Sequence, residues 1–268
     1  MRSWSWLRYP QKNCKFVIPK TIIAMNEDLD NIKYSLIHNY RYSELFREVE
    51  YNGKTLSDEK RKELVAVIDE TIDQYKEGLP MMSDELERYK NLHDEYHELS
   101  RVLNSLMLFV LITMIDSMVA SKYFIQADKE YDRRFMRGKL MVILNEGFKK
   151  MYGFDEKTHK KSEWDKLRPF LKYFPEQIHY QYQELTYLLE QHATTSSWWK
   201  EERNLETHLD AEKLYHSRQE EIIESKVIMD SMKLFNTLHA VNLFLTDMHG
   251  CLTNHLIAMY RRGELKEE

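Results

Sequence analysis

Apolar residues recur at three- and four-residue steps along most of this chain of 268 residues, which is the spacing of one face of an α-helix. The helices that these stripes predict cover residues 26–47, 57–77, 83–126, 129–152, 162–174, 176–192, 198–224 and 230–262. Amphipathic stripes of this length leave water by packing against one another. We therefore expect an all-α fold, an elongated multi-helix bundle of about seven long helices.

Small polar residues and helix breakers predict where several of these helices begin and end. Ser57 and Ser162 can cap helix starts, since each comes directly before an acidic residue that favours the first turn. Gly78 and Pro80 are expected to end the second helix, and Ser83 to begin the third.

That break also suggests a division of the chain. The sequence predicts an N-terminal helical segment, residues 1–82, and a helical bundle core, residues 83–268. The alternative is one continuous domain over residues 20–262.

Composition narrows the class of protein. Only 7 Gly and 5 Pro are present, too few for the many turns of a β-sandwich or for the glycine-rich junctions of a doubly wound α/β fold. A net charge of −5 argues against a simple basic nucleic-acid-binding domain. Cys14 and Cys251 form no metal or disulfide pattern, and Met1–Pro10 lacks the apolar run of a signal peptide, so we expect a cytoplasmic protein.

The most apolar stretch is Val102–Ala120, and it contains Asp116. A carboxylate near the middle of a lipid-facing helix is costly, so we expect a buried central helix and no membrane association. A buried charge needs a partner, and Arg133, Arg134 or Arg137 is the expected one.

The strongest candidate for chemistry is Arg203-Asn204-Leu205-Glu206-Thr207-His208. RNA is cleaved without a metal when a base activates the ribose 2′-hydroxyl and a cation stabilises the charge that develops on the phosphate. Histidine titrates nearest to neutral pH, and arginine grips phosphate oxygens with two N–H groups. Trp198 and Trp199, just before the motif, can stack on bases as substrate-binding residues, although such pairs more often close a core.

An Arg, a polar residue, a short spacer and a His within an all-helical bundle resemble the motif of the HEPN superfamily. Many HEPN proteins are metal-independent ribonucleases of toxin–antitoxin, phage-defence and RNA-targeting systems, and they usually act as dimers. The resemblance implies that Arg203 stabilises the phosphate, Asn204 positions it and His208 is the acid or base. It also implies RNA as substrate, a homodimer, an antitoxin or other protein partner, and Asp116 as a supporting residue that orients Arg203.

Three alternatives stay open. Arg203 and His208 can instead belong to a solvated helix face, and a second Arg-to-His match, Arg88 to His93, has the same spacing. The protein can be a non-catalytic interaction scaffold assembled through its longest helix. A metal-binding bundle is the third alternative, although no cofactor and no metal ligand are expected. The residues weighed for that metal site are Asp94, His97, Glu146, Glu176, His179, His239, His249 and His255.

Overall fold

The computed structural model describes residues 56–88, 95–153, 162–195, 201, 203–205, 207, 211–217 and 224–262. The expected helix over residues 26–47 lies outside them. Every element of the described part is a helix, which confirms the all-α bundle. The elements are α3 (Asp58–Arg88), α4 (Glu95–Gln126), α5 (Glu130–Tyr152), the 3₁₀ helix η2 (Trp164–Tyr173), α6 (Glu176–Thr195), α8 (Ala211–Ser217) and α9 (Glu224–Arg261).

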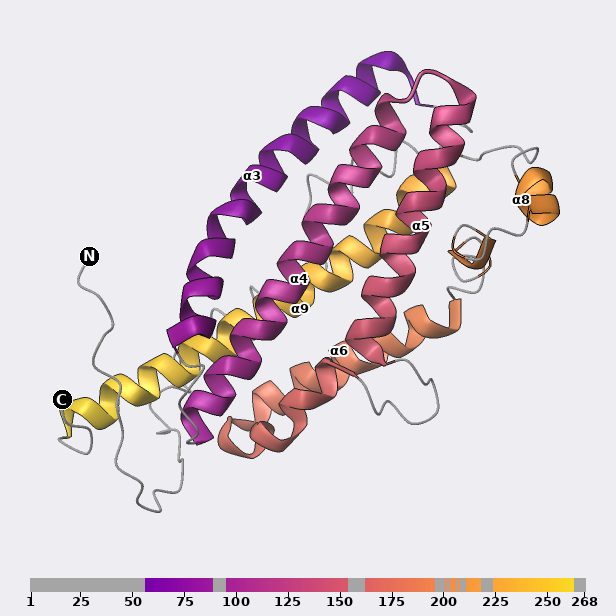
Figure 1. Ribbon diagram of the computed structural model, residues 1–268. Helices are drawn as coiled ribbons and strands as arrows, with labels where there is room; N and C mark the ends of the chain where they lie inside the picture. Colours follow the sequence, from indigo (N-terminus) through magenta and orange to yellow (C-terminus); the bar gives the residue numbers. More distant parts are fainter. Residues whose placement is uncertain are drawn as a thin grey trace.

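The helices α3, α4 and α5 lie side by side as a layer, and α9 crosses behind it (Figure 1). The order of contacts shows that α3 and α4 are antiparallel, since Asp69 pairs with Lys122 and Glu85 accepts a hydrogen bond from Asn104. The helix α4 packs against α3, α5, η2 and α9, so it is the central helix of the bundle.

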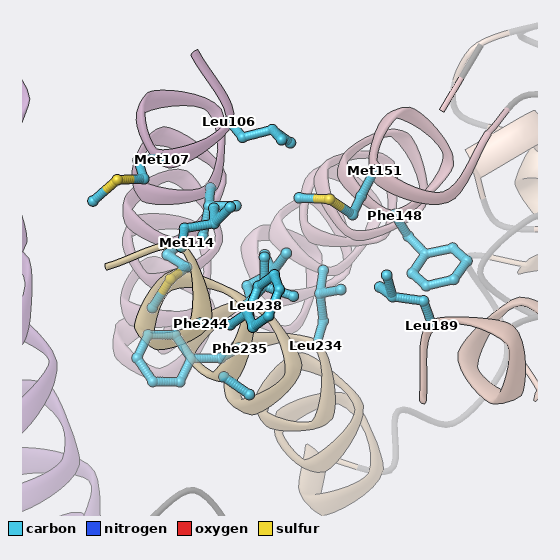
Figure 2. Close-up of a cluster of buried hydrophobic side chains, with 14 of the residues drawn as sticks. Leu106, Met107, Met114, Phe148, Met151, Leu189, Leu234, Phe235, Leu238 and Phe244 are labelled. Atoms are coloured by element: carbon cyan, nitrogen blue, oxygen red, sulfur yellow. The ribbon is translucent and has the colours of Figure 1, made fainter. Parts of the chain in front are cut away.

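Leucine, methionine and phenylalanine side chains fill the space between α4, α5, α6 and α9 (Figure 2). Met114 of α4, Leu144 of α5 and Leu238 of α9 are all 0% exposed. Each fully buried side chain of this kind contributes about 1.5–3 kcal/mol relative to an exposed position. Among the described helices, α4 alone is long and apolar enough to cross a membrane, and 61% of its most apolar window is buried inside the bundle.

Two predicted helix starts are confirmed. The Ser57 hydroxyl accepts a hydrogen bond from the Lys60 N–H at 3.3 Å, at the start of α3. The Ser162 hydroxyl accepts one from the Asp165 N–H at 3.2 Å and donates to the Met151 carbonyl at 2.7 Å. Ser162 therefore joins the end of α5 to the start of η2.

The predicted helix end at Gly78 and Pro80 is wrong, because α3 continues through both residues to Arg88. Proline removes one helical hydrogen bond, but the turns beyond it are fixed by packing. Met82 is 4% exposed, and the side chain of Glu85 accepts a hydrogen bond from Asn104 of α4. The expected boundary between residues 82 and 83 consequently falls inside a helix.

Two further details of the predicted helices are corrected. Glu224, expected at the end of one helix, is the first residue of α9. Phe135, an apolar residue of the helix predicted over residues 129–152, is 44% exposed in α5 and is not buried against a neighbouring helix. The stripe pattern does not determine which side of a long helix its neighbours leave uncovered.

Candidate functional site

The candidate site lies against α5. Arg203, in a helical stretch of described residues, reaches across to Glu146 of α5. Glu146 is held outward because its neighbour Gly147 faces α4, where an added Cβ would come within 2.4 Å of Thr113 Cγ2. Successive residues of a helix point about 100° apart, so the side chain of Glu146 points to one side of the contact between α5 and α4 and not into it.

The Arg203 guanidinium is held at two of its edges. Its Nε donates a hydrogen bond to Glu146 Oε1 at 2.7 Å, and its Nη2 lies 2.7 Å from the same oxygen. Its Nη1 donates to Asn204 Oδ1 at 2.9 Å. Arginine has five N–H donors, so two of them, one on each Nη atom, make no hydrogen bond with the described residues. Such a pair of N–H groups matches two oxygens of a phosphate.

The structure brings together only part of the predicted site. Arg203 and Asn204 are adjacent and hydrogen-bonded, and both are half-buried. His208, Trp198 and Trp199 lie outside the described residues, as does His93 of the second Arg-to-His match. Sequence reasoning missed the pairing of Arg203 with Glu146, which lies 57 residues away and was considered there only as a possible metal ligand.

Asp116 does not have its expected partner. Its side chain is exposed on α4, and it makes no hydrogen bond or ion pair with any described residue, Arg203 included. Arg133 donates to the Ala127 carbonyl instead, and Arg134 pairs with Glu130. The expectation failed because the apolar residues around Asp116 suggested burial, whereas Asp116 lies on a face of α4 that no described helix covers.

The metal-binding alternative receives no support from the described residues. None of their His, Cys, Asp and Glu side chains gather in a group of three or more. His179 Nε2 is hydrogen-bonded to the Leu171 carbonyl at 2.7 Å, and Glu176 accepts a hydrogen bond from Tyr180. His239 Nδ1 is 2.6 Å from the Tyr75 hydroxyl.

A surface pocket of about 360 Å³, which sequence reasoning did not anticipate, lies between η2 and α6. Its lining residues are Arg168, Leu171, His179, Tyr182, Gln183, Thr186, Tyr187 and Glu190. Among them, Tyr182 is buried and stacked on Trp164 with ring centroids 4.7 Å apart, and burial raises the pKa of its hydroxyl to about 12. The polar residues at three- and four-residue steps along α6 were the available signal.

No protein-family model, no curated protein and no solved structure matches this chain.

Proposed function

We propose that this protein is an HEPN-like, metal-independent endoribonuclease or RNA-binding protein of the kind that acts in toxin or phage-defence systems. The observation that supports this most is the arrangement at Arg203. Glu146 and Asn204 fix the guanidinium while two N–H groups keep their capacity for a phosphate. An arginine held in place before its ligand arrives loses less side-chain entropy on binding.

In the proposed reaction, His208 removes the proton of a ribose 2′-hydroxyl, whose oxygen then attacks the neighbouring phosphorus. The bond from phosphorus to the 5′-oxygen breaks and that oxygen takes a proton from water, leaving a 2′,3′-cyclic phosphate and a 5′-hydroxyl, while His208 returns its own proton to the solvent. Arg203 stabilises the charge that builds on the phosphate oxygens, and Asn204 positions the phosphate. Trp198 and Trp199 stack on the flanking bases.

The catalytic part of the proposal is tested with His208→Ala and a mixed-sequence single-stranded RNA. We expect the parent protein to cleave this RNA with EDTA present and the variant to have lost cleavage. RNA affinity and thermal unfolding should stay at the parent's values, because His208 takes part in the chemical step. Equal cleavage by variant and parent would remove the ribonuclease assignment.

The role of Glu146 gives a second prediction, for RNA binding. Glu146→Gln keeps an oxygen for Arg203 but removes one negative charge, so we expect several-fold tighter binding of single-stranded RNA. Arg203→Ala should weaken binding and lower the slope of log K against log salt by about 0.7, the share of one phosphate contact.

The control for this prediction is Asp69→Asn, which breaks a similar ion pair on another surface. Lys122 and Asp69 join two helices, with side chains 24% and 47% exposed, against 24% and 40% for Arg203 and Glu146. RNA affinity that rises equally in both variants would mean that overall charge, not the Arg203 site, determines binding.

A non-catalytic interaction protein is the second candidate function. The observation that favours it is the face of the central helix that no described helix covers, where Ile112 is 42% exposed and Tyr123 is 53% exposed. Large apolar side chains aligned on one exposed face are typical of protein-binding surfaces.

A further inference from the structure

One face of α4 is covered by no described helix. The exposed or half-buried residues on it recur at three- and four-residue steps, and they are Arg101, Ser105, Phe109, Ile112, Asp116, Val119 and Tyr123. We call this set the α4 stripe. Ser121 of α4 is hydrogen-bonded to Ser231 of α9, which crosses behind the layer (Figure 1). Residues two positions apart on a helix point about 160° apart, so Val119 and Tyr123 of the stripe lie on the side of α4 away from α9. At 1.5 Å per residue the stripe is about 33 Å long.

Ile112 lies at the middle of the α4 stripe, with a negative charge on one side of it and a positive charge on the other. Asp116 lies on one side of Ile112, about 6 Å further along the helix axis. Phe109 lies about 4.5 Å away on the other side, and the Lys150 ammonium of α5 is 5.5 Å from the centre of its ring. Ile112 therefore stands between an acidic and a basic position at similar distances.

Neither of these charges is neutralised by the other within one chain, since no ion pair joins Asp116 to Lys150. Partial burial of Asp116 among its apolar neighbours raises the pKa of its carboxyl group. A carboxylate held against apolar surface is stabilised when a cation approaches it.

We propose that a second copy of this chain packs on the α4 stripe, with the two α4 helices antiparallel and the two-fold axis beside Ile112. A two-fold axis at that point places Ile112 against its own copy. It also places Asp116 of each chain opposite Phe109 and Lys150 of the other chain. The two-fold symmetry therefore gives two equivalent pairs of an Asp116 carboxylate with a Lys150 ammonium. A self-complementary surface of this kind is what a two-fold interface requires.

The outer part of the α4 stripe fits the same register. Val119 falls opposite Ser105 of the other copy, a small residue that leaves room for it. Tyr123 falls opposite Arg101, and an arginine over an aromatic ring is a favourable contact. This interface is independent of the ribonuclease proposal, because it contains none of the residues around Arg203.

The first test measures the association of the full chain by sedimentation over a series of concentrations. One helix face is smaller than a standard stable interface, so we expect a concentration-dependent equilibrium of monomer and dimer. Ile112→Glu should raise the dissociation constant at least about tenfold, because it adds two carboxylates at the axis beside Asp116.

The matched control is Leu188→Glu on α6. Leu188 is 43% exposed and Ile112 is 42% exposed, so both changes remove the same kind of surface residue. We expect Leu188→Glu to associate as the parent does. A parent that is monomeric throughout, a dimer that survives Ile112→Glu, or an equal loss in the control would each overturn the proposal.

The second test fixes the register. Asp116→Lys and Lys150→Glu should each weaken the dimer, and the double variant should restore it, since the swapped charges again meet across the axis. A double variant weaker than both single variants would overturn the antiparallel register. Ile112→Cys should give a disulfide-linked dimer on oxidation, and Leu188→Cys should not; equal cross-linking of the two would also overturn it.

Discussion

Gly147 and Gly250 both lie inside helices, and they differ in what surrounds them. A Cβ at Gly147 would come within 2.4 Å of Thr113 Cγ2, whereas a Cβ at Gly250 would meet nothing within 4 Å. Thr113 is branched at Cβ, and its hydroxyl donates to the Phe109 carbonyl at 2.8 Å, so its methyl group has little freedom to move. Close packing of helices around a glycine is therefore found at Gly147 of α5 and not at Gly250 of α9.

Gly147→Ala should therefore lower the free energy of unfolding, although alanine is the better helix former. We expect a loss of about 1–2 kcal/mol, since overpacking costs about 1–3 kcal/mol and helix propensity returns up to about 1 kcal/mol. Thr113→Ser, which deletes the methyl group and keeps the hydroxyl, should restore most of the loss in the double variant. Gly250→Ala, the control, should stabilise the protein by up to about 1 kcal/mol in urea unfolding.

The surroundings of His239 affect its pKa, and through the pKa they affect how the stability of the protein depends on pH. Its Nδ1 is 2.6 Å from the Tyr75 hydroxyl, and its ring lies parallel to that of Phe235. Burial lowers the pKa of His239, and burial also lowers that of His249. The folded protein thus takes up a proton at these residues less readily than the unfolded chain does.

The sign of the pH dependence follows from these lowered pKa values. The neutral forms of His239 and His249 suit the folded protein better than the charged forms do. Their contribution to stability is therefore complete above the unfolded histidine pKa of about 6.5 and is lost as the pH falls below it. We expect the free energy of unfolding to decrease between pH 7.5 and pH 5.5, by at most about 1.4 kcal/mol per pH unit for each histidine. His239→Phe should make this decrease shallower; a slope identical to that of the parent would show that His239 does not contribute.

At the scale of elements, one buried carboxylate joins the ends of three helices. Glu224, 1% exposed at the start of α9, pairs with Arg61 of α3 at 2.7 Å and accepts the Leu56 N–H at 3.0 Å. The same arginine donates to the Ile125 carbonyl near the end of α4 at 2.7 Å. The beginnings of α3 and α9 are in this way attached to the last turn of α4.

Glu224→Gln should lower the free energy of unfolding by about 2–3 kcal/mol, somewhat less than for a fully buried pair because Arg61 is 18% exposed. Glu63→Gln, which breaks an exposed pair with Lys60 on the same helix, should cost less than about 0.5 kcal/mol. The double variant Arg61→Met, Glu224→Met should recover part of the loss. Chemical denaturation checks all three values, and equal costs for Glu224→Gln and Glu63→Gln would contradict this role.

Local signals in the sequence predicted a helix boundary correctly where neighbouring residues determine it, and wrongly where contacts with another helix do. Ser57 and Ser162 cap helices as expected, because a cap depends on residues only three positions apart. Pro80 did not end a helix, since the contacts that hold the following turns come from α4. Glu224 of α9 likewise has its partner far away in the sequence, since Arg61 is 163 residues from it.

At the scale of the whole molecule, the sequence predicted only the part of the candidate site whose residues are adjacent in the chain. Arg203 and Asn204 are neighbours in sequence and lie together in space. The carboxylate that holds Arg203 comes from α5, and no spacing rule connects residues so far apart. Asp116 was assigned to the interior for the same reason, because hydrophobicity alone does not show that one face of α4 is left open by the helices that the structure describes.

The order of the helices along the chain has a consequence for synthesis. The central helix α4 buries Leu103, Val110 and Met114, and α9, which packs against it, begins about 100 residues after α4 has ended. The face of α4 that packs on α9 therefore stays without that partner while about 100 further residues are synthesised. We expect such nascent chains to engage chaperones until residues 224–261 have emerged.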